Sequence, residues 1–144
     1  MTKPTLIKWE AVGSINDACT DISFTYGSGA HATLAIRMHF SRLKGAAQRD
    51  LLITFKSPIG FRWDEEGPYC LESLPPVQSM PKLETGEHPT WTFPLLLLES
   101  SPWVAKHLQV RAGAKLNHYV FISLNDTVEV LGEKDAKAEW VDAI

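Results

Sequence analysis

The sequence predicts an α+β domain: mostly antiparallel β-sheet, arranged as a curled sheet or a sandwich, with one short helix. Three observations predict this fold. Apolar and polar residues alternate through residues 31–40, turn residues join neighbouring alternating segments into hairpins, and one short segment after Ser101 has helical spacing. Alternation with a period of two buries one strand face and exposes the other, which is typical of antiparallel sheets.

The strands are justified by this alternation and by the turns between them. In 31–40 five apolar side chains alternate with five others, and 21–26 alternate in the same way, joined by Gly27-Ser28-Gly29 into a predicted hairpin. A second hairpin is predicted from 118–124 and 127–131 around Asn125-Asp126, because Asn and Asp tolerate the backbone of tight turns. Further strands are expected at 5–12, 50–56, 91–98 and 138–142.

Two local signals refine this picture. Pro94 cannot donate to a strand ladder, so the strand 91–98 is expected at a sheet edge or bulged there. A homodimer through the opposite edge is then an open alternative. Ser101-Pro102 predicts a helix start, the pair Val104 and Leu108 share a helix face, and Gly113 is the expected stop.

Composition sets the class of protein. The 144 residues form one expected domain, 1–144, without repeats or an internal boundary. With 44% hydrophobic and 22% charged residues, the chain is not of the disordered type, and no apolar run approaches the ~20 residues of a membrane span. A net charge of −3 with scattered Lys and Arg argues against nucleic-acid binding. With no N-terminal signal and two cysteines, a cytoplasmic location is expected.

Chemical motifs are absent from the sequence. It contains no glycine-rich phosphate loop, no Gly-x-Ser-x-Gly elbow, no Cys-x-x-Cys and no His-Glu-x-x-His, so no catalytic residue, cofactor or metal is predicted. His118 lies on the same strand face as Val120 and Ile122, and it is expected to be a hydrogen-bonded structural histidine rather than a ligand.

The segment 64–90 is the irregular part of the chain, with five prolines. Loops of this length are often functional. Most of the five tryptophans are expected to pack in the core or at its edges, but tryptophan is also enriched at binding surfaces. The predicted partner or ligand contacts are Trp63, Asp64, Glu65, Glu66 and Trp103.

Several short pieces look familiar together: Gly60-Phe61-Arg62-Trp63-Asp64-Glu65-Glu66, Ser101-Pro102-Trp103, His118-Tyr119-Val120-Phe121-Ile122, and Val128-Glu129-Val130-Leu131 with Trp140. They resemble a group of small, uncharacterised bacterial proteins with a Ser-Pro-Trp segment followed by a C-terminal His-Tyr hairpin. The resemblance implies a bacterial source and an unassigned function. The resemblance implies no active site. Some small bacterial domains of similar appearance act as immunity or partner-binding proteins.

Three functions follow as hypotheses. The first is a non-enzymatic module that binds another protein, of the immunity type in one version, based on mild acidity, abundant tryptophan and the missing catalytic motifs. The second is a small-molecule-binding domain with a pocket between sheet and helix, lined by Trp63, Trp91 or Trp103. The third is an enzyme, which requires Asp64, Glu65, Cys70 or His88 to converge.

Overall fold

The computed structural model describes residues 3–13, 15–27, 32–40, 49–64, 80–110 and 112–143. Two antiparallel sheets account for most of them: a five-stranded sheet in the order β1-β6-β7-β8-β5 and a four-stranded sheet in the order β2-β3-β4-β9. The strands are β1 (Thr5–Lys8), β2 (Cys19–Gly27), β3 (Thr33–Phe40), β4 (Arg49–Lys56), β5 (Gly60–Asp64), β6 (Leu95–Glu99), β7 (Leu116–Ile122), β8 (Thr127–Glu133) and β9 (Lys137–Asp142). The helix α1 (Pro102–Leu108) connects β6 to β7. The predicted α+β class with mostly antiparallel sheet is confirmed.

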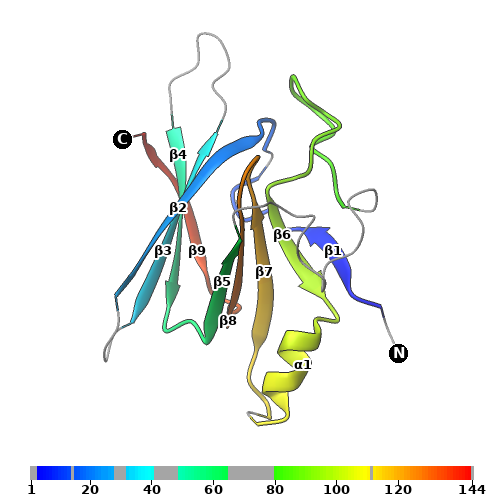
Figure 1. Cartoon of the computed structure of the whole chain (residues 1–144), viewed down its shortest axis with the longest axis vertical. Helices are drawn as coiled ribbons and strands as arrows, with labels where there is room; N and C mark the ends of the chain where they lie inside the picture. Colours follow the sequence, from blue (N-terminus) through cyan, green and yellow to red (C-terminus); the bar gives the residue numbers. More distant parts are fainter. Residues whose placement is uncertain are drawn as a thin grey trace.

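The two sheets pack against each other as a sandwich (Figure 1). The alternation predicted for β3 is confirmed, because every second residue of the strand is buried: Leu34, Ile36, Met38 and Phe40. Aromatic contacts join the sheets, since the Phe55 ring of β4 lies 4.9 Å from that of Tyr119 on β7. Tyr119 therefore marks the inner face of the five-stranded sheet, and its neighbours in sequence lie on the outer face.

Both predicted hairpins are present. β2 pairs with β3, and β7 pairs with β8 in a register that places Ile122 opposite Thr127. The chain passes between the sheets at 57–59, from β4 to β5, and again at 134–136, from β8 to β9. As a result β5 and β2, which lie at the edges of different sheets, come together at one side of the sandwich, where Phe24 meets Phe61 at 5.5 Å.

The edge position predicted for the Pro94 strand is wrong. β6 lies between β1 and β7, inside the five-stranded sheet. Proline is accommodated because β6 begins at Leu95, so the missing N–H removes no bond from the ladder. The Pro94 carbonyl is used, accepting a hydrogen bond from the Ile122 amide at 3.0 Å. The argument for a homodimer through the opposite edge loses its premise with this correction.

Other elements differ from their predicted limits. β1 is shorter than 5–12, and β5 occupies residues that alternation did not identify as a strand. α1 begins as predicted, with Ser101 as its N-cap and Pro102 in its first turn, but it ends at Leu108. Gly113, with φ +87, lies beyond the helix in a separate turn.

Cys19 is buried, and burial raises the pKa of its thiol far above the ordinary range, so the side chain packs as an apolar group.

Candidate functional site

A buried pair of ionisable side chains lies on the outer face of the five-stranded sheet. The register of the β7–β8 hairpin places Val120 opposite Glu129 and His118 opposite Leu131, so His118 and Glu129 are diagonal neighbours on this face. Their side chains meet at 2.6 Å, His118 Nε2 to Glu129 Oε1, and each residue is only 1% exposed. Burying such a pair is costly, and hydrogen bonds to its remaining polar atoms reduce that cost.

Ser101 completes the pair from the other side of the imidazole. Its Oγ lies 2.6 Å from His118 Nδ1 and also accepts the Val104 amide at 3.2 Å, which caps α1. The serine hydroxyl can donate to Nδ1 while the Nε2–H donates to the Glu129 carboxylate, which satisfies every ring nitrogen. We call this chain the Ser101–His118–Glu129 network. The predicted hydrogen-bonded role of His118 is confirmed.

The same three residue types form hydrolytic triads, so the network has to be tested against that chemistry. Ser101 is 4% exposed, and its oxygen is already used as the helix cap. The residue after it is Pro102, which has no N–H to stabilise an oxyanion, whereas hydrolase elbows use that amide. The geometry is therefore better explained by a clamp that fixes α1 on the sheet than by a nucleophilic serine.

Two side chains cover this network. The indole of Trp103, on α1, meets the His118 ring edge to face at 5.2 Å, and the guanidinium of Arg62, on β5, lies 4.2 Å from the centre of the indole. Arg62 Nε is 3.8 Å from Glu129 Oε2, a buried carboxylate oxygen that has no hydrogen-bond partner among the described residues. Gly60 allows this packing, because a Cβ there would lie 3.0 Å from the Trp103 ring.

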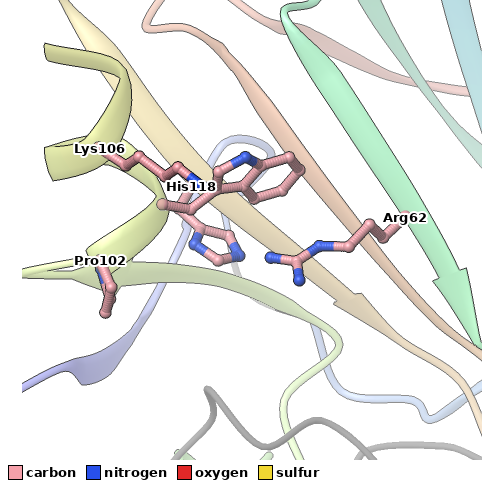
Figure 2. A pocket seen from close by; sticks show the side chains of 5 residues that line it. Arg62, Pro102, Lys106 and His118 are labelled. Carbon is pink, nitrogen blue, oxygen red and sulfur yellow. The ribbon is translucent and has the colours of Figure 1, made fainter. Parts of the chain in front are cut away.

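Two pockets flank α1. The smaller, of about 420 Å³, is lined by Arg62, Pro102, Trp103, Lys106 and His118 (Figure 2). The larger, of about 930 Å³, lies between α1 and the end of the sheet formed by β1, β6 and β7. Its apolar wall includes Ile7, Leu97, Val104, Leu108 and Leu116, and its polar groups include Asn117 and Lys134.

The structure separates the residues predicted as contacts. Trp103 lines the smaller pocket. Trp63 pairs with Val128, so it lies on the other face of β5 from Arg62, and its indole N–H donates to Asp126 at 3.3 Å. Asp64 ends β5, two residues beyond Arg62 on the same strand face. Glu65 and Glu66 lie outside the described residues, as does Cys70, and His88 stacks on Trp91 at 3.9 Å.

Trp63 belongs to a second surface, where the edge strands β2 and β5 meet. Phe24 contacts both Phe61 and Trp63, with ring centres 5.5 and 6.1 Å apart, and Tyr26 contacts Phe61 at 5.5 Å. Tyr26 is 46% exposed and Trp63 is 47% exposed. We call these four side chains the aromatic seam.

Sequence reasoning missed Arg62, Ser101 and Glu129 as parts of one site. A signal for Glu129 was present: Glu129 and His118 are polar residues near the middle of one face of two strands joined by a short turn. Because the turn at Asn125-Asp126 sets the register of the hairpin, His118 and Glu129 are expected at diagonal positions. Arg62 had no such signal, because β5 was not predicted.

Three further findings complete the description of the protein. Within the described ranges, no group of His, Cys, Asp or Glu side chains has the arrangement of a metal site. In the same part of the chain, no helix has the length and apolar character needed to cross a membrane. Comparison with known proteins gives no match among family models, curated proteins or solved structures. The resemblance to small bacterial proteins therefore stays a prediction.

Proposed function

We propose that this protein binds a small, largely apolar molecule in the larger pocket beside α1. The observation that carries the proposal is the pocket itself. Its volume of about 930 Å³ falls in the range of sites that enclose small ligands. It lies between sheet and helix, where the second hypothesis from the sequence expects a pocket, but its lining includes none of Trp63, Trp91 and Trp103, and Trp103 lines the smaller pocket instead.

The chemistry of the walls supports this class of ligand. Ile7, Val104, Leu108 and Leu116 offer apolar surface from three different elements, so an apolar body would be enclosed from several sides. Lys134 supplies a cation, which would orient an acceptor or an anionic group on the ligand.

The Ser101–His118–Glu129 network supports the proposal through rigidity. It ties the first turn of α1 to β7 and β8 by two hydrogen bonds of 2.6 Å. A pocket wall that is fixed before binding loses less conformational entropy when a ligand arrives. The network is therefore best explained as a support for the helix that forms one side of the pocket.

A pocket-filling variant tests the proposal. Ala105 lies on α1 and lines the larger pocket, so Ala105→Trp should occupy it. In a fragment screen by saturation-transfer NMR, we expect hits on the wild type whose affinity falls by about tenfold or more in this variant, since a filled pocket loses most apolar contacts. Ala112→Trp, in the turn after α1, is the matched control and should keep the hits. Equal binding to both variants would contradict the proposal.

A second candidate is the protein-binding module, which the aromatic seam favours. Exposed tryptophan and tyrosine are typical of binding hot spots. They lie between β2 and β5, each of which pairs on one side only within the described part of the chain. Open strand edges present unpaired backbone groups, so the partner segment that fits this surface is an extended strand of another protein.

Photo-crosslinking tests this second candidate. A benzoylphenylalanine in place of Tyr26 should capture a defined partner in cells of the source organism, and Trp63→Ala should abolish the capture, because the partner would lose its aromatic anchor. The same crosslinker in place of Leu124, which is also exposed, serves as the control. Capture that Trp63→Ala leaves unchanged, or that position 124 reproduces, would count against the seam as a binding surface.

A further inference from the structure

We propose that the smaller pocket is a separate binding site for an oxyanion group, a carboxylate or a phosphate, held by Arg62 and Lys106. This site goes beyond the proposed function, because its cavity of about 420 Å³ adds Arg62 and Trp103, which do not line the larger pocket, to Pro102, Lys106 and His118, which line both. Figure 2 shows the Arg62 side chain reaching from β5 toward His118, with Lys106 extending from α1 toward the same space.

The first step of the argument is the orientation of Arg62. One face of its guanidinium rests on the Trp103 ring at 4.2 Å, and its Nε lies 3.8 Å from the buried Glu129 carboxylate. These two contacts occupy one flat face of the guanidinium and the side that carries Nε. The edge that carries the two terminal nitrogens has no ion-pair partner among the described residues. That edge matches the two oxygens of a carboxylate or phosphate.

The second step is the charge around the pocket. Lys106 adds an exposed ammonium from α1 and forms no ion pair within the part of the chain that the structure describes. Even with Glu129 ionised, Arg62 and Lys106 leave an excess of positive charge at the pocket. A cationic ligand would be repelled, whereas an anionic group would gain from both side chains.

The third step is the preorganisation of the site. Arg62 is held by a ring and a carboxylate that are both fixed, since Trp103 packs on His118 and Glu129 is tied into the Ser101–His118–Glu129 network. A guanidinium that is already oriented loses little side-chain entropy when it binds an anion. The same network that supports α1 therefore also presents Arg62.

The experiment is a titration followed by ¹⁵N NMR at constant ionic strength, with sodium chloride replaced by inorganic phosphate in one arm and by sodium acetate in the other. We expect saturable shifts of the Arg62 Nε–H and the Trp103 indole N–H. The arm with the tighter binding identifies the source of the oxyanion. Shifts that fail to saturate in both arms would overturn the proposal.

Two variants separate binding from folding. Lys106→Gln removes an exposed charge without touching the buried network, and Arg62→Lys keeps the charge but loses the two-pronged edge. Each should weaken anion affinity by about tenfold, the equivalent of one charge-assisted hydrogen bond. The matched control Lys134→Gln lines only the larger pocket and should bind as the wild type does. Wild-type affinity in both Lys106→Gln and Arg62→Lys would contradict the assignment.

The Ala105→Trp variant keeps this proposal separate from the proposed function. Ala105 lines only the larger pocket. Anion binding should therefore survive in Ala105→Trp, even though fragment binding is lost. Loss of anion binding in this variant would show that the anion enters the larger pocket and would overturn the assignment to the smaller one.

Discussion

Replacing Glu129 by leucine is expected to lower the free energy of unfolding by about 1–3 kcal/mol, the usual cost of leaving a buried hydrogen-bond donor without its acceptor. The substitution leaves the His118 Nε2–H without an acceptor in a position that is 1% exposed. Arg62 also loses the carboxylate that lies 3.8 Å from its Nε. Urea unfolding followed by tryptophan fluorescence measures the change.

Two controls make the Glu129 result specific. Glu139→Gln changes an exposed carboxylate on β9 and should alter stability by about 0.5 kcal/mol or less. In the double variant His118→Leu and Glu129→Leu, both polar partners are gone, so the loss should be clearly smaller than the sum of the single losses. A cost below about 1 kcal/mol for Glu129→Leu, or additive losses in the double variant, would show that the network does not stabilise the fold.

Replacing Phe55 by alanine is expected to lower the free energy of unfolding by about 3–5 kcal/mol, because it opens a cavity between the sheets. Phe55 is 2% exposed, and its ring packs against Tyr119 at 4.9 Å and Phe121 at 6.1 Å. Its other neighbour is Gly132, where a Cβ would approach the ring to 3.0 Å. The ring thus fills space between β4 and the β7–β8 hairpin.

Calorimetry or chemical unfolding measures the Phe55 effect, with Phe55→Leu as the control. Leucine keeps most of the buried volume, so its cost should be about 1.5 kcal/mol or less. Similar losses for alanine and leucine would indicate that the ring contacts across the sandwich, rather than the filled volume, dominate. A small loss for alanine would mean that the sheets do not pack around Phe55.

The fold was largely predictable because strand alternation is a local signal. In β3 the buried residues Leu34, Ile36, Met38 and Phe40 repeat every second position, and the turn residues around 27–29 and 125–126 mark the hairpins. The proline rule failed at Pro94 for a simple reason. The proline lies one residue before the strand, where its missing N–H does not matter.

The order of the strands was not predictable, because it depends on contacts between distant segments. β1 pairs with β6, and β5 pairs with β8, although more than sixty residues separate each pair in the sequence. The segment Gly60–Asp64 carries only a weak strand signal, because the alternation of Phe61 and Trp63 with polar residues or glycine extends over just five positions. Only its partner β8 determines that this segment is extended.

The candidate site was predictable only in part, for the same reason. Trp103 was identified from its type, and His118 from its place on an apolar strand face. The pockets arise where α1 meets β1, β6, β7 and β5, elements that the sequence does not bring together by itself. Trp63 and Trp103 lie on different surfaces, because consecutive residues of β5 point to opposite faces and Arg62, not Trp63, packs on Trp103.

The central claim is that the pocket beside α1 binds a small molecule, and methyl NMR tests it most directly. With labelled Ile, Leu and Val methyl groups, fragment hits should shift the signals of Ile7, Val104, Leu108 and Leu116 together and saturably. Methyl signals of Leu34 and Ile53, buried between the sheets, should stay in place. Shifts confined to residues outside the pocket, or no saturable shift at these four, would contradict the claim.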